Sequence, residues 1–284
     1  MGLLSFIGCD GKVGHLEQKP TVVVSFSILE DFVRNIAGDK VEIMTLVPRL
    51  SDPHTYQIKP TDMVTLKEAG LILAHGLGFE GWLKRVLTSP QLQHKYVEVA
   101  AHLNARTLPD GTMDPHTWHD VKLVMATIPE IVKALSNFYP EEKVFFERNA
   151  QAYLQKLKQV DKELRERFSG IPKEKRFVIT THDAFWYFGE AYGIVFLSPV
   201  GITTEQEPSA TTVANLIDLI RSQNIKAIFI ENLSNGRVVE QIAHETGSSP
   251  DGMLYADSIS EESGLATNYI DMVRYNTQKI ISAF

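Results

Sequence analysis

Three histidines and one aspartate in this sequence have the residue types expected of a metal site. His54 and His116 each stand in the same five-residue pattern, Asp-Pro-His-Thr followed by an aromatic residue. His182 stands in Thr-Thr-His-Asp-Ala-Phe, directly after a β-rich run, and Asp257 ends a second such run. An isolated histidine is more often a structural residue, but a repeated pattern favours a function. We therefore interpret His54, His116, His182 and Asp257 as ligands of one ion.

Neutral imidazole and carboxylate groups suit a divalent transition metal. Three imidazoles and one carboxylate offer four donors and cancel one unit of the ion's charge, which suits Zn²⁺ and tolerates Mn²⁺ or Fe²⁺. The ligands stand 62, 66 and 75 residues apart in the chain, whereas zinc fingers take ligands in close pairs. The aspartates two residues before His54 and His116 are candidates to accept an imidazole N–H.

An alternation of strands and helices must position these residues. The pattern predicts strands at 21–27, 41–47, 70–74 and 96–100, and again at 177–181, 194–197, 227–231 and 253–257, with helices between them. Such alternation predicts an α/β fold of two Rossmann-like lobes, each a parallel sheet flanked by helices. His182 and Asp257 would then lie at the carboxyl ends of strands, where open α/β sheets bind ligands.

A long helical stretch separates the two series of strands. Residues 141–168 contain no glycine or proline and have apolar residues near helical spacing. At 1.5 Å per residue such a helix spans roughly 42 Å, which exceeds one small domain. We therefore predict an N-terminal metal-binding lobe (20–140), a rigid connecting helix (141–169) and a C-terminal metal-binding lobe (175–284).

Charge and hydropathy exclude several classes of partner. The net charge is −7 and no stripe of lysine and arginine is present, which argues against nucleic acid and against an anionic membrane surface. After residue 20, no stretch approaches the roughly 20 apolar residues of a membrane span. We expect a monomer.

Cys9 is the one cysteine, so an intrachain disulfide is impossible. The apolar run that ends in Gly-Cys9 is similar to the tail of a bacterial lipoprotein signal, but it is short and lacks a basic start. Two interpretations remain open: a trimmed export signal that makes Cys9 a lipid attachment point, or a frayed tail with an incidental thiol.

Motifs along nearly the whole chain, from about residue 22 to 281, resemble the metal-binding solute-binding proteins of bacterial ABC transporters, the ZnuA-TroA-like family (cluster A-I). Beside the two Asp-Pro-His-Thr motifs, the resemblance rests on Ser-Phe-Ser-Ile-Leu at 25–29, Gly-Leu-Gly-Phe-Glu-Gly-Trp-Leu at 76–83, His-Asp-Ala-Phe-Trp-Tyr-Phe at 182–188, Ile-Glu-Asn at 230–232 and Leu-Tyr-Ala-Asp at 254–257. In that family, residues at the four positions named above bind the metal, and one long rigid helix joins the lobes.

Three departures from the family pattern bear on the ion. The segment 101–113 holds only His102, so the metal-scavenging loop of many zinc receptors is absent. The second motif continues with His119-Asp-Val, where His119 is either a rim histidine or a weak alternative ligand. The third ligand is His182, where manganese receptors often have glutamate, which favours zinc.

The resemblance implies a non-enzymatic receptor outside the cytoplasmic membrane, in the periplasm or lipid-anchored through Cys9. It would deliver zinc, or alternatively manganese or iron, to an ABC permease with its cytoplasmic ATPase. A zinc hydrolase is the rival, since it needs three protein ligands, an open position for water and a base, for which Glu231 is the candidate. A metal-independent adhesin or structural lipoprotein is the third alternative.

Overall fold

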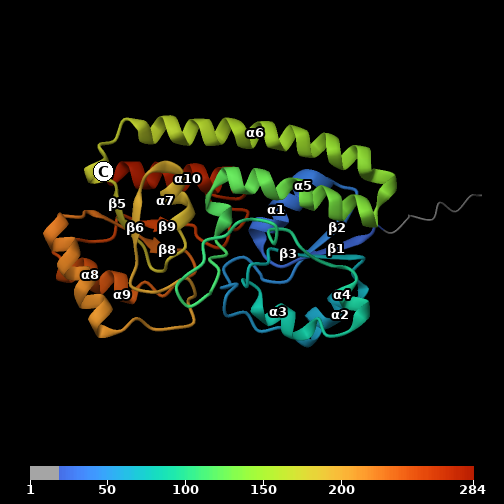
Figure 1. Cartoon of the computed structure of the whole chain (residues 1–284), viewed down its shortest axis with the longest axis horizontal. Coiled ribbons are helices and arrows are strands. Elements are labelled where there is room, and N and C mark those ends of the chain that lie inside the picture. The colour runs from blue at the N-terminus through green and yellow to red at the C-terminus, as the bar shows by residue number, and fades with distance from the viewer. Residues whose placement is uncertain (1–18) are drawn as a thin grey trace, which may run out of the picture.

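Parallel strands form the core of both halves of the chain, as the alternation predicts. The computed structural model describes residues 19–284. Figure 1 shows two lobes side by side, with α6 running across both of them. The α/β class is therefore confirmed, with two parallel-stranded lobes and one long helix.

The N-terminal lobe has a four-stranded parallel sheet in the order β2-β1-β3-β4. Its elements are β1 (Thr21–Val24), α1 (Ser27–Ala37), β2 (Glu42–Thr45), α2 (Pro60–Glu68), β3 (Leu71–Ala74), α3 (Gly81–Val86), α4 (Pro90–Gln93) and β4 (Tyr96–Glu98). The central strands β1 and β3 are almost continuous apolar runs because both faces of a parallel sheet are covered. The sequence pattern missed α4, which is a single turn.

Two helices and two short 3-10 turns lead out of this lobe. They are η1 (Thr117–His119), α5 (Val121–Phe138), η2 (Pro140–Glu142) and α6 (Lys143–Ser169). The helix α6 buries one stripe of side chains at intervals of three or four residues and contacts α1, α5, α7 and α10. Because those neighbours come from both halves of the chain, α6 packs against both lobes (Figure 1).

The C-terminal lobe repeats the architecture with shorter strands. Its elements are η3 (Lys173–Lys175), β5 (Phe177–Ile179), α7 (Trp186–Tyr192), β6 (Val195–Leu197), α8 (Ala210–Gln223), β7 (Ala227–Ile228), β8 (Ile230–Glu231), α9 (Arg237–Glu245), β9 (Met253–Leu254) and α10 (Tyr269–Ser282). The strand predicted at 227–231 is divided: β7 pairs with β5, whereas β8 pairs with β9. The backbone N–H of Phe229 donates to Ile179, and that of Ile230 to Gly252, so the chain changes partner between these residues.

Hydrogen bonds from α6 attach it to each lobe. The Tyr153 hydroxyl donates to Asp31 of α1 at 3.4 Å, and the Tyr192 hydroxyl of α7 donates to Asp161 of α6 at 3.2 Å. Asp31 also accepts the backbone N–H of Tyr269, the first residue of α10. Thus the first turn of α10 contacts the N-terminal lobe, although α10 follows the last strand of the C-terminal lobe. The exact domain boundaries therefore stay a prediction.

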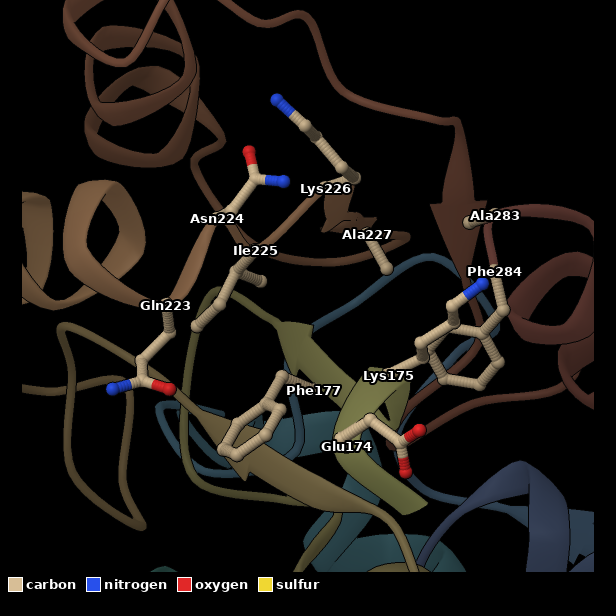
Figure 2. Close-up of a pocket in the computed structure, with 10 residues that line it drawn as sticks. All are labelled: Glu174, Lys175, Phe177, Gln223, Asn224, Ile225, Lys226, Ala227, Ala283 and Phe284. Carbon is tan, nitrogen blue, oxygen red and sulfur yellow. The ribbon is translucent and has the colours of Figure 1, made fainter. Parts of the chain in front are cut away.

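A cavity of about 300 Å³ lies at the amino-end edge of the C-terminal sheet. Phe177 and Ala227, which begin β5 and β7, line it together with the C-terminal residue Phe284 (Figure 2). His182 follows the opposite, carboxyl end of β5. This cavity is therefore on the far side of the lobe from the predicted metal ligands.

Within residues 19–284, no helix is both long enough and apolar enough to cross a membrane. Cys9, the predicted lipid attachment point, lies outside the described residues.

Phe146 near the start of α6 is completely buried, whereas the neighbouring Val144 is 77% exposed. We expect Phe146→Ala to lower the free energy of unfolding by about 3–5 kcal/mol because truncation leaves a cavity in the packed interior. Urea denaturation followed by circular dichroism measures this change. Val144→Ala is the matched control, expected within about 0.5 kcal/mol of the wild type, and equal losses in both variants would contradict the packing of α6.

Candidate metal centre

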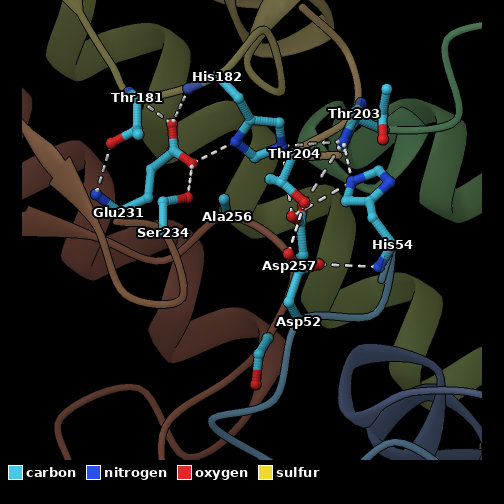
Figure 3. Close-up of polar contacts among 12 residues, drawn as sticks. Asp52, His54, Thr181, His182, Thr203, Thr204, Glu231, Ser234, Ala256 and Asp257 are labelled. Carbon is cyan, nitrogen blue, oxygen red and sulfur yellow. Dashed lines mark hydrogen bonds and ion pairs between the residues drawn. The ribbon is translucent and has the colours of Figure 1, made fainter. Parts of the chain in front are cut away.

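The four predicted ligands converge between the two lobes. His54 comes from the loop between β2 and α2, and His116 from the segment just before η1. His182 and Asp257 lie three residues beyond the carboxyl ends of β5 and β9. Each residue offers one ligand atom, and these atoms lie within 4.8 Å of one another. Figure 3 shows His54, His182 and Asp257 pointing toward a common centre.

The Nε2 atoms of the three imidazoles point at one another. His116 Nε2 lies 3.2 Å from that of His54 and 3.3 Å from that of His182. Asp257 oxygens lie 3.5 Å from His54 Nε2, 3.6 Å from His116 Nε2 and 3.3 Å from His182 Nε2. Ligands at 2.0–2.1 Å from a tetrahedral ion are about 3.3 Å apart. The donor set therefore has the dimensions of one coordination shell.

The centre is almost closed to solvent. The side chains of His116 and His182 are 0% and 1% exposed, and those of Asp257 and His54 are 3% and 6% exposed. Asp257 Oδ1 is buried and, among residues 19–284, has no hydrogen-bond partner. An unpaired buried carboxylate oxygen is costly unless a cation or a donor faces it, so this atom fits a bound cation.

Glu231 fixes the ring of His182. Its carboxylate accepts the His182 Nδ1–H, and its other oxygen accepts the backbone N–H groups of Thr181 and His182 at 2.8 and 2.9 Å (Figure 3). The Ser234 hydroxyl donates to Glu231 as well. With its proton on Nδ1, His182 presents the Nε2 lone pair to the centre. Glu231 is thus a positioning residue rather than a base facing a substrate.

Asp114 does the same for His116. Its Oδ1 accepts the His116 Nδ1–H at 2.8 Å, which confirms that the acidic neighbour accepts an imidazole N–H. Arg106 donates to Asp114 and to Asp183, which belong to different lobes. The Tyr187 hydroxyl also donates to the backbone carbonyl of Asp114. Local sequence patterns do not reveal the contacts of Arg106 with Asp183 and of Tyr187 with Asp114, because each joins residues more than 70 positions apart.

Asp52, in the first motif, makes a different contact from Asp114. It accepts the backbone N–H of His54 at 2.8 Å, not its ring. Within residues 19–284, the Nδ1 of His54 has no hydrogen-bond partner, so its ring orientation is held less firmly than those of His116 and His182.

Buried charges shift the pKa values of the predicted ligands in opposite directions. Burial disfavours protonated His182, but the Glu231 and Asp257 carboxylates outweigh it and raise the pKa of His182 well above its ordinary value. Burial also disfavours ionised Asp257, but His182 and the other imidazoles hold the pKa of Asp257 well below its usual range. Burial lowers the pKa of His116. The centre therefore favours a positive charge between His182 and Asp257.

His119 is not a rim histidine, which corrects the sequence-based interpretation. It is 0% exposed and its ring packs on Phe185, with 4.3 Å between ring centroids. Its nitrogens do not join the four converging ligand atoms, and burial lowers its pKa to about 3. The 3-10 turn at Thr117–His119 directs the side chain into the interior, which a local sequence pattern does not reveal.

Comparison with known proteins identifies the family. The model of the family described as "ZnuA: Zinc-uptake complex component A periplasmic" matches residues 22–283. The chain belongs to this family of metal-binding receptors. Its members are substrate-binding components of metal ABC transporters, which work with a permease and an ATPase, and they are not enzymes. The resemblance inferred from the motifs is thereby confirmed, and the zinc hydrolase is excluded.

Relatives of this ZnuA-family chain are named for different metals. It is 35% identical over 272 residues to the iron-binding protein YfeA of Yersinia pestis, and this match covers 94% of this chain and 87% of that protein. It is 30% identical over 262 residues to the manganese-binding lipoprotein MntA of Halalkalibacterium halodurans, covering 92% and 87%. Divalent metal binding is therefore common to the relatives, whereas the metal differs among them.

Solved structures agree with the fold. The periplasmic zinc-binding protein TroA of Treponema pallidum superposes with a TM-score of 0.88 at 31% identity, over 93% of this chain and 99% of that one. A manganese-bound periplasmic metal-binding protein of Candidatus Liberibacter asiaticus superposes with a TM-score of 0.82 at 31% identity, over 93% and 99%. The two-lobed arrangement is therefore that of metal-binding receptors.

Replacing the Glu231 carboxylate tests its role on His182. We expect Glu231→Gln to weaken metal binding by about 10–100-fold, because an amide does not hold the Nδ1 proton of His182 as a carboxylate does. Competition with a fluorescent chelator measures the dissociation constant.

Ser234→Ala is the matched control, since it removes only the hydroxyl that donates to Glu231. It should weaken binding by less than about threefold if the carboxylate is the essential group. Unchanged affinity in Glu231→Gln would contradict the positioning role.

Proposed function

We propose that this receptor captures zinc through His54, His116, His182 and Asp257 and delivers it to its ABC permease for import. The observation that carries the proposal is the convergence of three Nε2 atoms and one carboxylate at coordination-shell distances in a nearly closed centre. Four protein donors leave little room for a reactive water, as capture without catalysis requires.

Nitrogen-rich coordination supports zinc over manganese. Three imidazoles suit zinc, whereas manganese prefers oxygen donors, and intrinsic affinity follows the same order at most sites. Relatives named for manganese and iron make those ions the alternatives. Availability of each metal where the receptor acts also contributes to what it carries.

We further propose that the receptor acts as a monomer outside the cytoplasmic membrane. Several relatives are named as lipoproteins, which supports an extracytoplasmic position and an anchor through Cys9. Because α6 packs on both lobes, we expect small relative movements of the lobes on metal release rather than wide opening.

Competitive titration of metal-free protein tests the proposed ion. We expect zinc to bind the wild type at least about 100-fold more tightly than manganese because of the three nitrogen donors. Asp257→Ala should abolish tight binding of both ions, since it leaves the centre without its anionic ligand. Manganese affinity equal to that of zinc would overturn the choice of zinc, and retained binding in Asp257→Ala would overturn the site.

A His182→Glu variant provides a second comparison on the same titration. An oxygen donor in place of the imidazole should narrow the preference for zinc over manganese. Because Glu231 would then face a second carboxylate, the control is the same substitution combined with Glu231→Gln. A preference unchanged in both variants would show that His182 does not contact the ion.

Metal affinity should fall as the pH falls. His182 has a pKa raised well above its ordinary value, so metal binding displaces a proton from it near neutral pH. We therefore expect the dissociation constant for zinc to rise by about tenfold per unit between pH 8 and pH 6, as the loss of one proton requires. Isothermal titration in buffers of different ionisation enthalpy counts the protons released, and a pH-independent affinity would contradict histidine ligation.

A further inference from the structure

The four proposed ligands are not held equally firmly. His182 is held by Glu231 and stands close after β5, which is paired in the sheet. The segment of His116 is held by the Tyr187 hydroxyl of the opposite lobe, which donates to the carbonyl of Asp114. Next to Asp257, the carbonyl of Ala256 accepts the indole N–H of Trp118. His54 instead lies in the irregular segment between Thr45 and Pro60 and has the most exposed side chain of the four.

One hydrogen bond joins the segment of His54 to the opposite lobe only two residues away from His54. The Thr204 hydroxyl donates to Asp52 Oδ2 at 2.5 Å, across 152 residues of sequence (Figure 3). The other oxygen of Asp52 accepts the backbone N–H of His54. A single carboxylate therefore connects the backbone of His54 to the C-terminal lobe.

Two further contacts hold the same segment, but neither connects the backbone of His54 to the C-terminal lobe. Trp82 donates its indole N–H to the carbonyl of Pro53, and both residues belong to the N-terminal lobe. Arg49 donates to the carbonyl of Ser260 across the lobes, but it stands five residues before His54. Asp52 is the residue that bonds both to His54 and to the facing lobe.

A pocket of about 460 Å³ opens on the His54 side of the centre. His54 is the one proposed ligand among its lining residues, which come from both lobes and include Trp82, Met113 and Ile202. Because the other three proposed ligands do not line this pocket, His54 is the proposed ligand that separates it from them.

We propose that Asp52 and Thr204 form a latch that positions His54 over the bound ion, and that the ion enters and leaves through the pocket beside His54. This proposal rests on the proposed metal site and adds positioning residues and a route to it. When the latch is intact, His54 stays within reach of the ion. When the Thr204 hydroxyl is lost, the His54 segment separates from the C-terminal lobe more often, and the ion escapes faster.

Substitution of Thr204 separates the hydroxyl from the shape of the side chain. We expect Thr204→Val to raise the dissociation rate of zinc by about tenfold, because a hydrogen bond to a charged group is lost, with an association rate within about twofold of the wild type. Stopped-flow mixing of the zinc-loaded protein with excess chelator measures dissociation, and mixing of metal-free protein with zinc measures association.

Two control variants make the result specific. Thr204→Ser keeps the hydroxyl and should release zinc at about the wild-type rate. Thr212→Val removes a hydroxyl that pairs with Ser209 at the start of α8, does not line this pocket and makes no contact with Asp52, and it should also leave the rate unchanged. Thermal unfolding of the metal-free variants identifies any loss of folding, and Thr204→Ala carries the same expectation if the valine variant is unstable.

The outcomes distinguish this proposal from the proposed function. If the wild type binds zinc through Asp257 but Thr204→Val releases it no faster, the latch is wrong and the site stands. An equal rise in Thr204→Ser, or a loss of affinity that comes entirely from slower association, also overturns the latch. If the wild type binds no metal, the proposed function itself fails.

Discussion

Three imidazole nitrogens meet at one centre and constrain the whole molecule, since the Nε2 of His116 lies only 3.2 Å from that of His54 and 3.3 Å from that of His182. Their lone pairs repel, and burial removes the water that would screen them. Such an arrangement is favourable only around a positive charge, whether an ion or a proton. Asp257 supplies the balancing negative charge and has an oxygen with no hydrogen-bond partner in the described part of the chain. Each lobe contributes two of the four residues, so this balance of charge depends on the contact between the lobes.

Carboxylates behind the imidazoles make the arrangement specific. Glu231 and Asp114 hold the Nδ1 protons of His182 and His116, so both rings direct an acceptor atom to the centre. Each carboxylate also accepts backbone N–H groups beside its histidine, which ties ring orientation to the course of the chain. Both of these carboxylates are thus buried with hydrogen bonds to the ring and to the backbone of the histidine that they orient. In residues 19–284, no carboxylate accepts the Nδ1–H of His54, and His54 is the proposed ligand that we connect with entry and release.

The long helix α6 is the reason we expect only small movements of the lobes. It packs on α1 and α5 from one lobe and on α7 and α10 from the other. A continuous helix resists bending, so we expect the lobes to keep nearly the same relative position whether or not an ion is present. Under that condition, release depends on a local segment such as the one that carries His54. We therefore propose that metal capture depends on side-chain contacts between the lobes rather than on wide closure of the lobes.

The sequence by itself determined the class of fold and the residues of the candidate site. Both follow from local patterns, which can be recognised without the three-dimensional structure. These patterns are the alternation of strands and helices, the uninterrupted stretch that forms α6 and the repeated Asp-Pro-His-Thr motif. The tertiary structure alone decided which residues from distant parts of the chain meet. It divided the strand at 227–231, buried His119 against Phe185 and brought Asp52 to Thr204. These outcomes depend on contacts between distant segments, whose geometry is set by the packing of the lobes and not by neighbouring residues.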